Sequence, residues 1–110
     1  MSKYVLFFSY TPETWERMMM KPADRTAAVR GLLESVGGEL ESLYYMFGDR
    51  DGLVIFDAPE AQDAAAVSLT VNTTGAFAHL ETHALIAPTD LTRVLEKAGS
   101  ARESYRRPGD

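Results

Sequence analysis

Residues 3–10 read KYVLFFSY, a short aromatic and branched run that ends at Thr11-Pro12. Apolar side chains occur at both even and odd positions of this run: Tyr4, Leu6 and Phe8 on one side, Val5 and Phe7 on the other. Successive side chains of a strand point to opposite faces of its sheet. The run therefore predicts a buried strand with two apolar faces.

Outward from this strand, the chain alternates between short apolar runs and helix signals. Three further strands are expected, at residues 39–47, 53–58 and 76–86. Proline at a first helical position loses no hydrogen bond, so it is a helix-start signal. Helices are expected to begin at Pro12, about Pro22, Pro59 and Pro88. The first is interrupted at Lys21-Pro22, and the second ends near Val36.

The order strand, helix, strand, hairpin, strand, helix, strand predicts an α+β fold of the ferredoxin-like split β-α-β type. Right-handed crossovers place the strands of its antiparallel sheet in the spatial order fourth, first, third, second. We assign residues 1–98 to this domain. Residues 99–110 are polar and without periodicity, and we interpret them as a C-terminal tail.

Two helices can cover only one face of such a sheet. Whichever parity points outward, the first and third strands each expose an apolar pair: Val5/Phe7 or Leu6/Phe8, and Leu53/Ile55 or Val54/Phe56. An uncovered patch of this kind on a small protein usually marks an interface. We therefore expect two copies to pair sheet to sheet as a homodimer, or to form a higher homo-oligomer.

Composition narrows the classes of function. The 110 residues contain no cysteine, which excludes disulfides, a thiolate nucleophile and cysteine-bound metals. The 16 acidic and 11 basic residues give a formal charge of −5 without charge blocks, so nucleic acid is not an expected partner. The longest apolar run near the N-terminus, Tyr4 to Phe8, is too short for a signal peptide or a membrane span. We expect no membrane partner and a cytoplasmic location.

Four segments of the chain are distinctive: KYVLFFSYTPETW at residues 3–15, KPADRTAAVRGLLESVGGELESLYYMFGDRD at 21–51, the alanine-rich helix that follows, and YRRPG at 105–109. Together they resemble the GYD domain family. The resemblance covers nearly the whole chain. It implies a dimeric α/β barrel, a superfamily in which ferredoxin-like subunits pair through their sheets.

The resemblance departs from the family at its Gly-x-Tyr-Asp signature. The corresponding stretch here is Gly48-Asp49-Arg50-Asp51, with arginine in place of the tyrosine. The wider superfamily includes isomerases, cofactor-free monooxygenases, haem enzymes and stress-responsive proteins. Membership therefore implies the fold more closely than it implies a reaction.

Polar side chains of the fourth strand form the most informative constellation. His79, Glu81 and His83 are two residues apart, so they share one face of the strand. The two histidines are about 13 Å apart along the strand, too far to bind one metal ion. The alternative to a ligand-contacting role is an ordinary polar face of an edge strand. His83 is the candidate ligand if haem were bound, but no cofactor and no metal is implied.

A second group of residues is expected at one end of the sheet. The carboxyl ends of the first and third strands are expected at the same edge as the amino ends of the second and fourth. Ser9, Tyr10, Asp57 and His79 should therefore gather there, near Trp15. Apolar walls with a few polar groups are typical of a ligand pocket. We interpret His79 as a general base and Tyr10 or Ser9 as the hydrogen-bond donor to an enolate. The alternative is that Tyr10 and Trp15 only close the core.

Two adjacent tyrosines of the second strand are further candidates for contact with a ligand. Tyr44 and Tyr45 face opposite sides of it, so one is expected in the helix-covered core and the other on the dimer face. Either could contact a ligand, although packing is the commoner role of a half-buried tyrosine. Met18, Met19 and Met20 line a pocket entrance or fill a seam beside the helix break.

The sequence therefore predicts a small homodimeric protein that binds an apolar or aromatic small molecule. Isomerisation, cyclisation and cofactor-independent oxidation are the reactions that this interpretation admits. The alternative is a non-catalytic assembly or stress-response module. The substrate is not specified by the residues, because a fold does not determine its chemistry.

Overall fold

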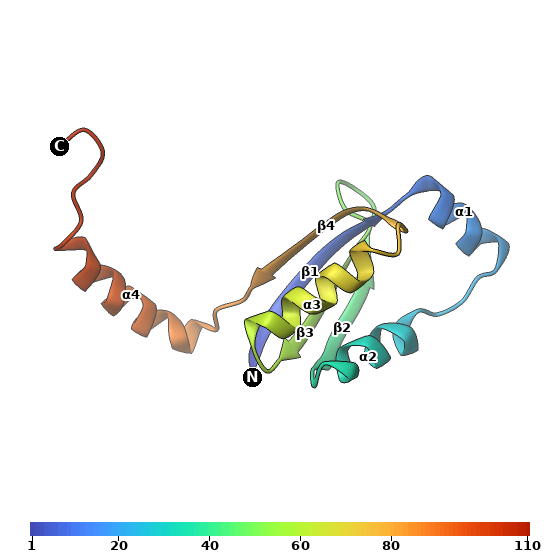
Figure 1. Cartoon of the computed structure of the whole chain (residues 1–110), viewed down its shortest axis with the longest axis horizontal. Helices are drawn as coiled ribbons and strands as arrows, with labels where there is room; N and C mark the ends of the chain where they lie inside the picture. Colours follow the sequence, from blue (N-terminus) through green and yellow to red (C-terminus); the bar gives the residue numbers. More distant parts are fainter.

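The computed structural model describes all 110 residues (Figure 1). Its strands are β1 (Ser2–Tyr10), β2 (Glu39–Tyr45), β3 (Gly52–Ala58) and β4 (Phe77–Ala84). Its helices are α1 (Pro12–Met20), α2 (Thr26–Ser35), α3 (Ala61–Asn72) and α4 (Pro88–Arg102). Strands and helices thus follow one another in the order predicted from the sequence.

The four strands form one antiparallel sheet in the order β2-β3-β1-β4, which confirms the predicted ferredoxin-like topology. β1 lies at the centre, with Val5 opposite Ile55 of β3 and His83 of β4. Because β1 runs antiparallel to both neighbours, its carboxyl end lies beside the amino ends of β3 and β4. The carboxyl end of β2 lies at this same edge, where Tyr45 pairs with Gly52.

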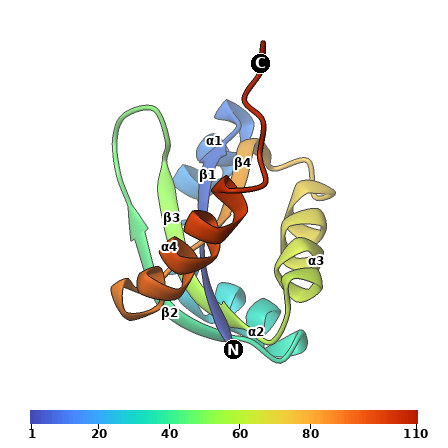
Figure 2. The same ribbon diagram turned by 90° about the vertical axis from the view of Figure 1, so that its left-hand side faces the viewer.

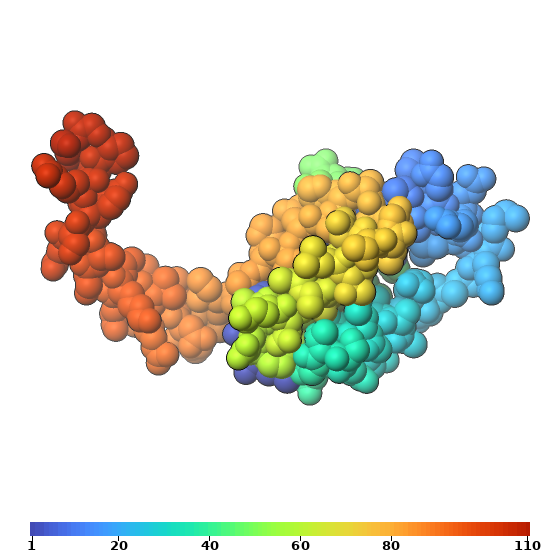
Figure 3. All heavy atoms as spheres, viewed as in Figure 1, coloured from blue at the N-terminus to red at the C-terminus, as the bar shows by residue number.

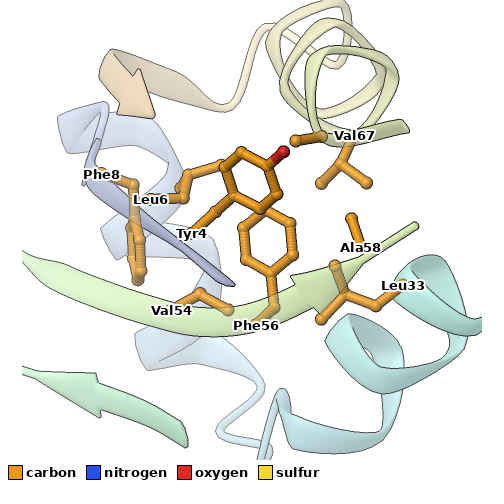
Figure 4. Packing of buried hydrophobic residues seen from close by; sticks show 9 residues of the cluster. Tyr4, Leu6, Phe8, Leu33, Val54, Phe56, Ala58 and Val67 are labelled. Carbon is orange, nitrogen blue, oxygen red and sulfur yellow. The ribbon is translucent and has the colours of Figure 1, made fainter. Parts of the chain in front are cut away.

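A hydrophobic core lies between one face of the sheet and helices α2 and α3 (Figure 4). Phe56 is fully buried at its centre, and Leu33 of α2 and Val67 of α3 pack over the sheet. The even-numbered residues of β1 point into this core. Its nine members are Tyr4, Leu6, Phe8, Leu33, Val54, Phe56, Ala58, Ala64 and Val67.

The opposite face carries no helix, and we call it the open face. It is defined by the apolar residues Val5, Phe7, Leu53 and Ile55, which pair across β1 and β3, together with Tyr44 of β2. Tyr44 is 65 % exposed. The sequence left open which parity would point outward; the structure assigns the even positions of β1 to the core and the odd ones to the open face.

Helix starts differ from the prediction at two places. α2 begins at Thr26 rather than near Pro22, because the Asp24 carboxylate accepts hydrogen bonds from the backbone and hydroxyl of Thr26 and so fixes the first turn there. α3 begins at Ala61, two residues after Pro59, since Glu60 is extended and its N–H donates to the Asp63 carboxylate.

Helix α4 projects from the body as an arm (Figures 1 and 3). It continues to Arg102, past the point at Gly99 where the sequence predicted the start of a polar tail. None of its residues is buried, and Leu91, Val94 and Leu95 remain exposed. In Figure 2, where the arm points toward the viewer, α4 lies in front of the sheet and apart from α3. The radius of gyration is accordingly 17.7 Å, against about 13 Å for a compact chain of this length.

A transmembrane helix needs about 20 mostly apolar residues. No helix of this chain is both long enough and apolar enough to cross a membrane.

Candidate ligand-binding cleft

Five aromatic rings gather where β1 ends. The Tyr10 ring lies 5.1 Å from the Trp15 ring of α1 and 5.1 Å from the Phe77 ring of β4, measured between centroids. Phe8 and Tyr45 complete the group, with their ring centroids 5.9 Å apart. Edge-to-face and tilted arrangements predominate, as the charge distribution of aromatic rings favours. This edge of the sheet is therefore held in shape by ring packing.

Asp51, just before β3, fastens the aromatic group to the sheet. Its carboxylate accepts the backbone N–H of Tyr10 at 2.9 Å and the indole N–H of Trp15 at 3.0 Å. Its own N–H donates to the carbonyl of Phe8 at 2.9 Å. One side chain thus joins β1, α1 and the β2–β3 connection. These bonds were not expected from the sequence, in which Asp51 appears only as part of the Gly48-Asp49-Arg50-Asp51 stretch.

An open cleft of about 540 Å³ begins at this aromatic edge and runs between the sheet and the helices. Leu6, Phe8 and Phe56 belong to its floor, and helices α2 and α3 supply wall residues that include Val29 and Val71. Of its 22 lining residues, 17 are hydrophobic. Its volume falls within the range of about 300–1,000 Å³ that is usual for small-molecule sites.

Two tyrosine hydroxyls provide the polar end of the cleft. The Oη atoms of Tyr10 and Tyr45 are 3.2 Å apart, and both residues line the cleft. Burial, and then the hydrogen bond to Tyr45, raise the pKa of the Tyr10 phenol well above its ordinary value. The Tyr10 hydroxyl therefore remains protonated near neutral pH. It can act as a hydrogen-bond donor or acceptor, but not as a resident phenolate.

The histidine constellation lies on the open face, away from the cleft. Glu81 joins both rings: its Oε1 is 3.2 Å from His79 Nε2 and its Oε2 is 2.9 Å from His83 Nε2. Arg50 donates from Nε to Glu81 Oε1 at 2.7 Å. The hydrogen bonds from His83 and Arg50 lower the pKa of Glu81 to about 2. No group of three or more histidine, aspartate or glutamate side chains is arranged to hold a metal ion.

The predicted association of His79 with Tyr10 is wrong. Both lie at the same end of the sheet, but on opposite faces. Ser9 is the cross-strand partner of His79 and lies with it on the open-face side, whereas Tyr10, the next residue, lines the cleft. The side chains of consecutive strand residues alternate between faces. Two residues at the same end of a sheet share a face only if their parity also agrees, and His79 and Tyr10 differ in this respect.

Asp57 lies at the opposite end of the sheet from Ser9 and Tyr10. β3 runs antiparallel to β1, so its carboxyl end is beside the amino end of β1, where Asp57 pairs with Lys3. Lys3 Nζ is 3.2 Å from Asp57 Oδ2 and 2.6 Å from Glu41 Oε1. The hydrogen bond to Glu41, and next that to Asp57, raise the pKa of Lys3. The error came from assigning β3 the direction of β1.

The remaining predicted residues divide between the two faces. Tyr45 lines the cleft and Tyr44 lies on the open face, as their adjacency requires. Trp15 packs against Tyr10 and Tyr45 but does not line the cleft. Met18 lines the cleft, while Met19 and Met20 are exposed.

Comparison with known proteins adds the family. A family model described as GYD domain matches residues 4–95. The chain belongs to the GYD domain family. In this GYD domain, Asp51 holds the aromatic edge, and Arg50 reaches the open face and pairs with Glu81. A search of the curated proteins finds no significant match.

Two solved structures share the fold of this GYD domain. FFRP-DM1 is 14 % identical, with a TM-score of 0.53 over 78 % of this chain and 100 % of its own. The 30S ribosomal protein S6 from Thermotoga maritima is 18 % identical, with a TM-score of 0.55 over 89 % of this chain and 97 % of its own. At these identities the likeness shows a common ferredoxin-like fold and nothing of function.

Replacing Asp51 tests whether its carboxylate holds the aromatic edge. Asp51→Ala leaves the Tyr10 and Trp15 N–H groups without their acceptor, so the free energy of unfolding in urea should fall by about 1–3 kcal/mol. The fluorescence of Trp15, the only tryptophan, should change as well. The matched control is Asp49→Ala, because the exposed Asp49 carboxylate makes no hydrogen bond; it should change stability by less than about 0.5 kcal/mol. Equal losses in the two variants would contradict the assignment.

The Glu81 pairings predict a dependence of stability on pH. The folded-state pKa of about 2 lies below the ordinary value of 4.5. The stabilisation is therefore complete above the ordinary pKa and is lost as the pH falls from about 5 toward 2. Over this range, the urea midpoint of the wild type should fall more steeply than that of Glu81→Gln. Glu16→Gln, at an exposed position of α1, serves as the control and should follow the wild type; parallel curves for all three proteins would refute the prediction.

Proposed function

We propose that this GYD domain binds an apolar or aromatic small molecule in the cleft between its sheet and its helices. The observation that carries the proposal is the cleft itself, open, about 540 Å³ in volume and mostly hydrophobic, with paired tyrosine hydroxyls at one end. A packed core without a ligand role would lose contacts by leaving such a space open. A bound ligand would restore those contacts.

Within this proposal, Tyr10 and Tyr45 are the groups that orient the ligand. Each hydroxyl has one proton, and the bond between the two oxygens uses only one of them. The other proton is free to reach a carbonyl or enolate oxygen of a bound molecule. A cofactor-independent isomerisation, cyclisation or oxidation would use that hydrogen bond to stabilise negative charge. His79 has no part in this scheme, because it lies on the other face.

We further propose that the protein is a homodimer joined through the open faces. Val5, Phe7, Leu53 and Ile55 form a contiguous apolar centre on a sheet that no helix covers on this side. Polar groups border that centre, among them the Arg50–Glu81 pair. An apolar centre with a polar rim is the usual anatomy of an interface. A second copy would thereby complete a barrel.

A non-catalytic assembly module is the alternative function. The arm α4 favours it, because Leu91, Val94 and Leu95 lie exposed on a helix that touches nothing in its own chain's core. On this alternative, the apolar surfaces bind other protein chains and the cleft has no ligand. Direct measurement of ligand binding separates the two functions.

A neutral aromatic probe tests occupation of the cleft. N-phenyl-1-naphthylamine should bind the wild-type protein with enhanced fluorescence. Ala28→Phe, which places a ring at a lining position of α2, should weaken this binding at least about tenfold, the equivalent of about 1.4 kcal/mol. Ala27→Phe is the matched control, since Ala27 is exposed on the same helix and does not line the cleft. Absence of wild-type binding, or equal binding by the two variants, would contradict the proposed function.

Substitution on the open face tests the dimer. Ile55→Lys places an ammonium group in the apolar centre, and the desolvation of that charge would oppose association. Sedimentation equilibrium at micromolar concentration should show a dimer for the wild type and a monomer for the variant. Leu69→Lys changes an exposed leucine of α3, which lies outside the open face, and should leave the dimer intact. A monomeric wild-type protein would overturn this proposal.

A further inference from the structure

The charged residues that line the cleft are all basic. They are Arg17, Lys21 and Arg25, and no aspartate, glutamate or histidine lines it. This contrasts with the whole chain, in which 16 acidic residues outnumber 11 basic ones. The net charge of the chain is negative, so a cleft whose charged lining residues are all basic is not expected from the composition. These basic residues therefore indicate a specific role.

All three basic groups come from one short segment at the mouth of the cleft. Arg17 is in the last turn of α1, Lys21 follows that helix, and Arg25 directly precedes α2. All three are exposed, and none forms an ion pair with a carboxylate. Asp24, next to Arg25 in the sequence, accepts hydrogen bonds from the backbone N–H and the hydroxyl of Thr26, and Glu16, next to Arg17, forms no ion pair. The three cations are therefore available to a ligand.

The basic mouth and the tyrosine pair lie within reach of each other. Burial is the main influence on the Tyr10 phenol, but the charge of Arg25 also acts on it, in the direction of a lower pKa. An acidic group placed between Arg25 and Tyr10 would thus meet a guanidinium and a hydroxyl donor together. Such charge-assisted hydrogen bonds are the stronger kind, and guanidinium pairs well with planar carboxylates.

We propose that the ligand of the cleft is an amphipathic acid, with an aromatic or apolar body on the hydrophobic floor and one anionic group held at the mouth by Arg17, Lys21 and Arg25. This inference rests on the proposed ligand-binding function and specifies its ligand class. The apolar lining of the cleft favours a ligand with an aromatic or apolar part, and the three unpaired cations favour a ligand with an anionic group. The tyrosine hydroxyls then accept or donate hydrogen bonds at the junction of the two parts.

Two probes that differ only by one sulfonate group test the inference. The first is N-phenyl-1-naphthylamine, which is neutral; the second, 8-anilinonaphthalene-1-sulfonate, has the same rings and a sulfonate. The wild-type protein should bind the sulfonate at least about tenfold more tightly at low salt, and added salt should reduce the difference. Ala28→Phe should weaken the binding of both probes. That result would show that both bind in the cleft rather than on the open face.

Charge-removing variants complete the experiment. Arg25→Gln should weaken the binding of the sulfonate probe about fivefold or more and leave the binding of the neutral probe unchanged. Arg30→Gln, at an exposed position of α2 outside the cleft, should change the binding of neither probe. If the two probes bind the wild type equally, or if Arg25→Gln weakens both alike, the acidic-ligand inference is overturned and the ligand-binding function stands. If neither probe binds, the proposed function itself fails.

Discussion

A sheet with two apolar faces and helices for only one of them is the constraint on which this structure depends. Tyr4, Leu6 and Phe8 of β1 point into the core under α2 and α3. Val5 and Phe7 point to the face that no helix covers, where Val5 is 7 % exposed and Phe7 is half-buried. Burial of apolar area is the main favourable term in folding and in association. The helix-covered face forms the core of the chain, and the open face is the surface through which we propose that two copies associate.

The shape of the cleft depends on the aromatic edge of the sheet and not on the open face. Phe8, Tyr10 and Tyr45 are large enough to hold the sheet edge in shape without filling the space beneath the helices. Asp51 keeps this edge fixed through two hydrogen bonds, so the hydroxyl pair has a defined position relative to the cleft. Under the proposed function, Asp51 would position the side chains that contact the ligand without contacting the ligand itself.

Local sequence patterns were sufficient to predict the fold but not the site. Strand and helix order follow from apolar runs and proline positions, and handedness then determines the strand order. The site required two further facts: the direction of each strand, which separates Asp57 from Tyr10, and the parity of each residue, which separates His79 from Tyr10. Parity could have been deduced from the alternation of β1, because Ser9 and Tyr10 are consecutive. The reach of Asp51 to Trp15, 36 residues away in sequence, had no local signal. The sequence likewise does not show that α4 stands apart from the body, because its apolar residues could equally have packed against the sheet.

Isotope-filtered NOE spectroscopy on a mixture of labelled and unlabelled chains tests the central claim most directly, because it identifies the atoms that face a second copy. The two-faced sheet predicts intermolecular NOEs from the methyl groups of Val5, Leu53 and Ile55 to aromatic protons of Phe7 and Tyr44. Intermolecular NOEs confined to other surfaces, or none at all at millimolar concentration, would show that the open face stays in water and would contradict the account.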